Sequence, residues 1–188
     1  MRRRFQVQPR LILMTGVAGS GKTTLAKKIV PRLWAVYLDN NLIVDALFRD
    51  TRRGKAYESL RPCFYQSLYA ITEENLKLRN SVLLDVPHVK EMQLPEWRRF
   101  IKRMTTRTKA QLVVIKCVCS ERTLRSRIRS RGEARDRWKL AHWKAFMREQ
   151  PIQFPLRFPH IDIDTEKNLS NNVRAAIRYI TNRRTQAA

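Results

Sequence analysis

The sequence predicts an α/β protein: a five-stranded parallel sheet with helices on both faces. Five short, mostly apolar runs alternate along the chain with longer segments of helical periodicity. Strands that alternate with helices are joined by crossover connections, which makes the strands parallel and places helices over the sheet. No internal repeat or low-complexity linker interrupts the alternation. We therefore expect a single domain over residues 1–188, a length that supports a full core.

The predicted strands are recognised by short apolar runs bounded by polar or turn-forming residues. The run at 111–119, QLVVIKCVC, is continuous and β-branched, as in a strand buried on both faces. The segment 151–159, PIQFPLRFP, reads as an extended connector rather than a domain boundary, because a last strand has to join the sheet after it. The five strands are expected at 11–15, 36–38, 81–85, 111–119 and 160–164.

The predicted helices fill the intervals between these strands. The first follows the strand at 11–15 and is closed or bent by Pro31, which cannot donate a backbone hydrogen bond. The longest carries an apolar stripe formed by Leu60, Phe64, Leu68, Ile71 and Leu78. The helices are expected at 22–33, 41–50, 56–79, 91–108, 120–131, 137–149 and 171–181.

Charge is the strongest compositional feature of the chain. It holds 39 Lys and Arg against 16 Asp and Glu, for a net charge of +23, and four arginines fall within a basic N-terminal arm at 1–10. Such a field attracts polyanions, so a nucleic-acid partner is one interpretation. A solvated basic surface without a partner is the other, and composition alone leaves both open.

Cysteine usage and hydropathy bear on the environment of the protein. Cys63, Cys117 and Cys119 have neither metal-site nor disulfide-framework spacing, which predicts reduced, mostly buried thiols in a cytoplasmic protein. No apolar run approaches the ~20 residues that cross a bilayer, so we expect no membrane association through a spanning helix.

The most specific motif is GVAGSGKT at 16–23, which fits the pattern G-x-x-x-x-G-K-[ST] between a predicted strand and a predicted helix. Glycines in such a loop let backbone N–H groups converge on phosphates, at the positive end of the following helix. Lys22 is expected to reach the β- and γ-phosphates, and the Thr23 hydroxyl is expected to hold Mg²⁺. The predicted nucleotide-binding residues are Gly16, Gly19, Ser20, Gly21, Lys22, Thr23 and Thr24.

Charged residues outside the loop extend this prediction. Asp85 ends the third strand and is a candidate Mg²⁺ ligand, although a carboxylate there could instead cap the next turn. Arg127, Arg131 and Arg135 recur every four residues around Gly132, in a predicted lid at about 120–150. Arginines on a closing lid neutralise charge on a transferring phosphoryl group. A solvated basic helix face is the alternative for each of them.

Four stretches occur together in the order found in small phosphoryl-transfer enzymes: GVAGSGKTTLA, YLDNNLIVDALF, SVLLDVPH and LRSRIRSRGEARDRWKLAHW. Over residues 10–165 the chain resembles the AAA-type ATP-binding P-loop kinase-like family. It is similar to the kinase domain of phage polynucleotide kinase, and more remotely to zeta toxins. The resemblance implies a P-loop kinase fold with an Arg-rich lid, ATP and Mg²⁺ as cofactors, and transfer of the γ-phosphoryl group to a hydroxyl. It implies that Arg127 and Arg131 contact ATP and that Asp85 is the third-strand acid.

One position departs from the family pattern. The resemblance places the general base at residue 41, where this chain has Asn41, and a carboxamide cannot take a proton. Three interpretations stay open: Asp39 is the base, Asn41 only orients the acceptor, or the protein is a weak ATPase. Asp39 is also a suitable N-cap for the helix that follows it, and Asp45 is a more distant candidate base.

The sequence therefore predicts an ATP-dependent phosphotransferase acting on a hydroxyl acceptor that it does not identify. A nucleic-acid or nucleotide hydroxyl would account for the net charge of +23. A small metabolite or antibiotic would require only a local pocket. The third alternative is an ATP-gated nucleic-acid-binding protein with weak ATPase activity.

Overall fold

The computed structural model describes residues 8–50 and 52–182. Most of the predicted basic N-terminal arm, residues 1–7, lies outside these ranges. The described residues contain a five-stranded sheet in the order β2-β3-β1-β4-β5, and every neighbouring pair is parallel. This confirms the predicted fold class, and the strand boundaries agree with the predicted ones to within one residue. The strands are β1 (Arg10–Thr15), β2 (Val36–Asp39), β3 (Val82–Asp85), β4 (Gln111–Val118) and β5 (His160–Asp164).

α1 has the predicted bounds, 22–33, with Pro31 inside it and Trp34 after it in the left-handed conformation. The other helices differ from the predicted segments mainly in three places. α2 ends at Leu47, three residues before the predicted end. The segment 91–108 begins as a separate 3-10 turn, and α4 starts only at Pro95, a residue suited to a first helical position. The segment 137–149 is two short helices that meet at His142. The helices are α1 (Lys22–Leu33), α2 (Asn40–Leu47), α3 (Lys55–Lys77), η1 (Glu91–Gln93), α4 (Pro95–Thr108), α5 (Glu121–Arg131), η2 (Ala134–Asp136), α6 (Arg137–Ala141), α7 (Trp143–Glu149) and α8 (Leu169–Thr181).

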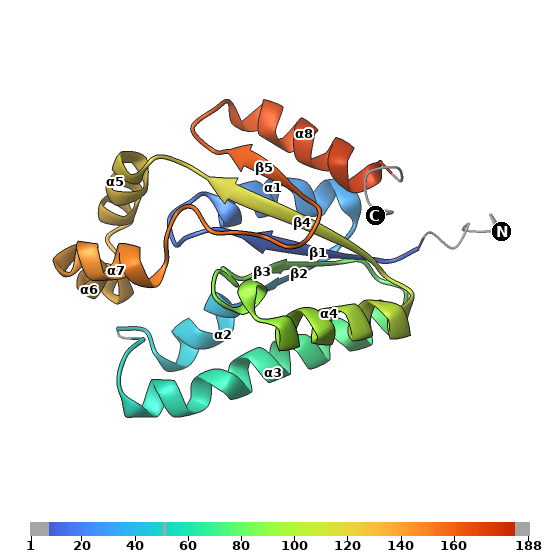
Figure 1. Cartoon of the computed structure of the whole chain (residues 1–188), viewed down its shortest axis with the longest axis horizontal. Helices are drawn as coiled ribbons and strands as arrows, with labels where there is room; N and C mark the ends of the chain where they lie inside the picture. Colours follow the sequence, from blue (N-terminus) through green and yellow to red (C-terminus); the bar gives the residue numbers. More distant parts are fainter. Residues whose placement is uncertain (1–7, 51, 183–188) are drawn as a thin grey trace.

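The sheet lies between two helical layers, with α3 and α4 on one face and α1 and α8 on the other (Figure 1). Alternate side chains of a strand point to opposite faces. Leu11 and Leu13 of β1 accordingly pack in the α3–α4 core, and Ile12 and Met14 pack in the α1–α8 core. All four are fully buried, which explains why β1 reads as a continuous apolar run.

A third apolar cluster attaches α5 and α7 to the loop after β1. Leu124 and Ile128 of α5 pack with Phe146 of α7 and with Val17 of the loop. These contacts place the predicted lid beside the glycine-rich loop, at the carboxyl ends of the strands. Open α/β sheets bind their ligands at that edge.

The apolar stripe predicted for α3 is only partly a core face. Phe64 and Leu68 are buried, whereas Leu60, Ile71 and Leu78 are 43%, 44% and 72% exposed. The N-terminal end of α3 projects beyond the sheet (Figure 1), which accounts for the exposure of Leu60 but not for that of Ile71 and Leu78, which lie toward the other end of the helix. Neither α3 nor any other helix in the described ranges has the length and apolar character needed to cross a bilayer.

Candidate active site

The loop between β1 and α1 has a conformation that only glycine allows at two positions. Gly16 has φ 131°, and a Cβ there would lie 2.4 Å from the carbonyl oxygen of Cys117 on β4. Gly19 has φ 89°, and a Cβ there would lie 2.8 Å from Ile128 on α5. Side chains at these positions would both strain the backbone and displace the neighbouring elements. The motif glycines therefore allow close packing of the loop against β4 and the lid.

Lys22, the first residue of α1, folds back over this loop. Its Nζ donates hydrogen bonds to the carbonyl oxygens of Gly16 (2.8 Å) and Val17 (3.0 Å), and its side chain is buried. Burial lowers the pKa of Lys22, and the nearby Asp85 carboxylate opposes this effect. Ser20 is also buried, and its Oγ has no hydrogen-bond partner among the described residues.

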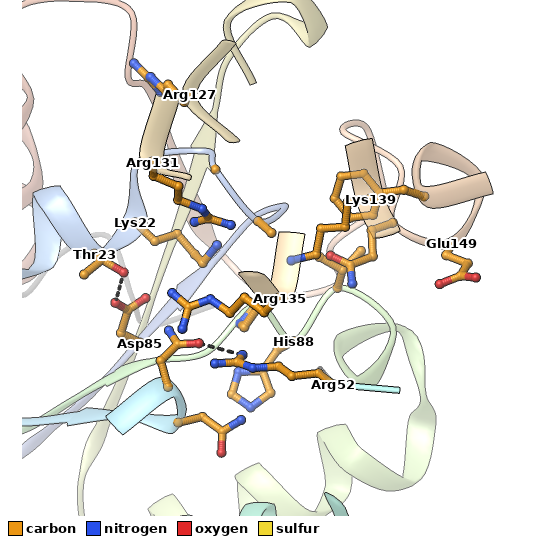
Figure 2. A pocket seen from close by; sticks show the side chains of 18 of the residues that line it. Lys22, Thr23, Arg52, Asp85, His88, Arg127, Arg131, Arg135, Lys139 and Glu149 are labelled. Carbon is orange, nitrogen blue, oxygen red and sulfur yellow. Dashed lines mark hydrogen bonds between the residues drawn. The ribbon is translucent and has the colours of Figure 1, made fainter. Parts of the chain in front are cut away.

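Thr23 and Asp85 meet at the start of α1. The Thr23 hydroxyl donates to Asp85 Oδ2 at 2.6 Å (Figure 2). Asp85 ends β3, the strand that pairs with β1. Asp85 is 2% exposed and also accepts from the Tyr37 hydroxyl at 3.0 Å. A hydroxyl and a carboxylate oxygen are ligands that suit Mg²⁺, which usually binds through one or two protein oxygens together with substrate phosphates and water. The two residues thus fit a Mg²⁺ ion on the phosphates.

Asp39 lies opposite Asp85 in the register of β2 and β3. It is the N-cap of α2, because its Oδ1 accepts from the backbone N–H of Asn41 (2.8 Å) and from the Asn41 carboxamide (2.7 Å). Its Oδ2 accepts from the Tyr37 hydroxyl at 3.2 Å. Burial and the neighbouring Asp85 carboxylate raise the pKa of Asp39, although the Asn41 and Tyr37 hydrogen bonds favour its charged form.

Asn41 lines the adjacent cleft, whereas Asp39, only 6% exposed, is not among the residues that line it. The Asn41 carboxamide oxygen accepts from Arg52 Nη1 at 2.7 Å. Arg52 also pairs with Asp45, and the same Asp45 carboxylate pairs with Arg135 of η2. Asp45 is therefore held between two guanidinium groups that link α2 to the lid.

The three predicted lid arginines line one cleft, but they lie on two different helical segments. α5 ends at Arg131, followed by Gly132 in the left-handed conformation with φ 64°, so Arg135 does not share a helix face with the others. Arg131 pairs with the buried Asp136, and its guanidinium lies toward Lys22 in Figure 2. Arg127 lies apart from them, donating to the hydroxyl and the carbonyl oxygen of Thr165, both at 2.8 Å (Figure 2).

The cleft has a volume of about 1140 Å³ and extends from the glycine-rich loop to the start of α3. Contacts between the lid and the α2–α3 loop bridge it: Arg53 pairs with Glu149 at 3.2 Å, and its guanidinium lies 3.1 Å from the ring centre of Trp138. Sequence reasoning missed Arg53 and Glu149, and no motif marks them. They meet because the α2–α3 loop and the helices α6 and α7, which are distant in the sequence, approach each other across the cleft.

His88 also lines this cleft. Trp97 Nε1 donates to the Tyr69 hydroxyl at 2.8 Å, and that hydroxyl lies 2.8 Å from His88 Nε2. The Tyr69 hydroxyl donates to His88 Nε2 when the imidazole proton is on Nδ1 and accepts from it in the other tautomer. Burial lowers the pKa of His88 to about 4, so the ring is neutral near pH 7.

A glycine-rich phosphate loop between a strand and a helix, in a parallel sheet with an acid at the end of the next strand, defines a P-loop protein of the kinase-like α/β class. Residues 11–151 match the model of a family described as an AAA domain, and the chain belongs to that family. The likeness to phage polynucleotide kinase and zeta toxins stays a prediction. No curated protein matches the chain.

Solved structures share this fold at low sequence identity. A sugar kinase from Janibacter sp. is 14% identical with a TM-score of 0.68, covering 96% of this chain and 99% of its own. Kti12 from Chaetomium thermophilum, in complex with ADP-AlF3, is 18% identical with a TM-score of 0.65, covering 90% and 96%. The APS kinase CysC of Mycobacterium tuberculosis, in complex with AMPPNP and APS, is 17% identical with a TM-score of 0.60, covering 93% and 99%.

Proposed function

We propose that this protein is an ATP-dependent phosphotransferase that transfers the γ-phosphoryl group to a hydroxyl acceptor. One observation carries the proposal: Lys22, Thr23 and Asp85 line the same cleft as the lid arginines. The volume of about 1140 Å³ exceeds what a nucleotide alone requires and leaves room for an acceptor beside it. The fold shared with solved kinases supports the same reaction class.

The phosphate side of the cleft serves to position and neutralise the nucleotide. The loop from Gly16 to Thr24 would surround the phosphates, with Lys22 directed at the β- and γ-phosphates. Thr23 and Asp85 would hold Mg²⁺, which supplies neutralisation of the phosphate oxygens when bound. Arg131 and Arg135 would stabilise charge on the transferring group, and Arg127 would contact the nucleotide farther from it.

On the acceptor side, we assign the orienting role to Asn41. Its carboxamide lines the cleft and is held by Asp39 on one side and Arg52 on the other. Asp39 would then be a positioning residue, because its carboxylate is occupied by the α2 cap. Phosphoryl transfer proceeds through a loose transition state whose rate depends mainly on positioning and electrostatics, so an acceptor can react without a strong base.

The test is transfer of label from γ-³²P-ATP to RNA, DNA, nucleosides and a panel of small metabolites. We expect a labelled acceptor with the wild-type protein and none with Lys22→Ala. Release of free phosphate without a labelled acceptor, across the whole panel and a cell extract, would contradict the proposed transferase.

The second candidate is an ATP-gated nucleic-acid-binding protein with weak ATPase activity. The observation that favours it is the place of Asp39, which lies outside the cleft lining and leaves Asn41 at the position where the family pattern has a base. In that case ATP would yield only ADP and phosphate, and nucleic-acid affinity would change between the ATP-bound and ADP-bound protein. A small-molecule kinase differs from both by labelling a metabolite and no nucleic acid.

A further inference from the structure

Most of the excess positive charge lies outside the cleft. Ten basic and five acidic side chains line the cleft, against 39 and 16 in the whole chain. Many of the cleft cations are also paired, as Arg61 is with Glu91 and Lys139 with Asp136. The proposed ATP site therefore does not account for the net charge of +23.

Two segments on one face of the molecule contain no acidic residue: 97–110 and 150–159. They contribute α4 and the connector before β5, which lie on the same side of the sheet. Leu156 and Phe158 of the connector pack against the α3–α4 core, and the rings of Phe158 and Trp97 are 6.2 Å apart. The fold thus joins two acid-free segments into one continuous surface.

Basic side chains project from this surface without partners. Trp97, Ile101 and Met104 turn the apolar side of α4 to the core, which leaves Arg99, Lys102 and Arg103 on the outer side. Within residues 8–50 and 52–182, these three side chains form no ion pair or hydrogen bond, and neither do those of Lys90 and Arg157. Glu96, in the first turn of α4, pairs with none of them. We call these five exposed residues, Lys90, Arg99, Lys102, Arg103 and Arg157, the α4 basic surface.

We propose that the α4 basic surface is a docking site for nucleic acid, bound through its phosphate backbone and without base readout. Charge complementarity supports this partner: four of these five exposed cations lie in segments without acidic residues, and such a surface matches a polymer that carries one phosphate per nucleotide. Binding of this kind releases counterions, so it is sequence-independent and weakens steeply with salt.

The composition of the face favours nucleic acid over an anionic membrane. A helix that lies in a membrane interface presents large apolar side chains beside its basic ones. The exposed side of α4 between Arg99 and Arg107 carries none, and the large apolar residues of this helix face the core.

The surface begins at the cleft. Lys90 is both a member of the α4 basic surface and a cleft-lining residue, and η1 and α4 continue from it away from the cleft. A strand bound along α4 would therefore reach the acceptor side at Lys90. This link to the cleft rests on the proposed function, whereas the docking site itself does not.

The test measures binding of fluorescein-labelled 20-nucleotide RNA and DNA, single-stranded and duplex, by anisotropy between 50 and 300 mM salt. The variant is Arg99→Gln/Lys102→Gln/Arg103→Gln. The matched control is Lys27→Gln/Lys28→Gln/Arg32→Gln, which removes the same charge from exposed positions of α1, on the opposite helical layer (Figure 1). Both are made in the Lys22→Ala background as well, so that binding is measured independently of ATP turnover.

We expect the α4 variant to lose at least tenfold in affinity and to lower the log–log salt slope by about 2 to 3, since each phosphate contact contributes about 0.7–0.9. The α1 control should lose less than threefold, and Arg99→Lys/Arg103→Lys, which keeps the charge, should bind like wild type. Equal losses in the α4 and α1 variants would overturn the site, because the charge would then act diffusely. Absence of salt-dependent binding by the wild type, or tighter binding to phosphatidylserine vesicles than to any nucleic acid, would overturn the partner.

Discussion

The substitution Asp39→Asn distinguishes two roles for Asp39, the general base of the reaction and the N-cap of α2. We expect it to leave most of the turnover intact. Asn and Asp cap helices about equally well, so the carboxamide introduced at position 39 can still accept from the backbone N–H of Asn41. The change removes a buried negative charge beside Asp85. Burial and the Asp85 carboxylate both raise the pKa of Asp39. A raised acid pKa means that the charged form is disfavoured in the folded state, so stability is lost as pH rises through that pKa. The melting temperature of Asp39→Asn at pH 7 should therefore equal or exceed that of wild type.

The expected losses of kcat and of unfolding free energy distinguish a general base from a helix cap at position 39. Loss of a general base costs about 10²–10⁴-fold in kcat, whereas we expect Asp39→Asn to lose less than about tenfold. Asp39→Ala, which removes the cap, should cost about 1 kcal/mol of unfolding free energy and lower the melting temperature by about 2–4 °C. The assays are kcat for ADP release together with thermal unfolding. A loss of 10²-fold or more in Asp39→Asn with unchanged ATP affinity would refute the positioning role and make Asp39 the base.

Three further outcomes are expected. Lys22→Ala should abolish both ATP binding, measured by calorimetry, and turnover; binding within threefold of wild type would contradict the phosphate role of Lys22. Arg131→Ala should lower kcat by about 10²-fold with a smaller loss of ATP affinity, because charge neutralisation matters most in the transition state; equal losses would place Arg131 in ground-state binding. His88 has a folded pKa of about 4, below its ordinary value of 6.5, so its share of stability is lost as pH falls below about 6.5. The unfolding free energy of wild type should drop by about 2 kcal/mol more than that of His88→Gln between pH 7.5 and 5.0, and equal drops in urea titrations would remove His88 as the cause.

The sequence predicted the sheet better than the helices. Strands β1 and β4 are buried on both faces, and a run of apolar residues such as LILMT reports that burial directly. The stripe on α3 was misleading, since periodicity shows that one side of a helix is apolar but not how far that side extends over the sheet. Helix breaks at Pro95 and His142 depend on loop packing, which local periodicity does not encode.

The candidate site also has one part that the sequence predicted and another that it did not. The glycine-rich loop is contiguous in the chain, and its geometry follows from residue type. Only glycine tolerates the backbone angles and the close neighbours at positions 16 and 19. Arg135 reaches the cleft although α5 ends before it, so the spacing that pointed to it assumed a helix that does not continue.

The sequence by itself determined the positions of the strands, the phosphate loop and the placement of Arg127 and Arg131 on one helix, because each depends on residues close together in the chain. Only the tertiary structure decided that Asp39 caps α2 while Asn41 lines the cleft, that Asp45 is held between Arg52 and Arg135, and that two acid-free segments form one face. These features depend on which side chains from distant segments come within hydrogen-bonding or ion-pairing distance. That proximity is set by the packing of the helices on the sheet and not by spacing along the chain.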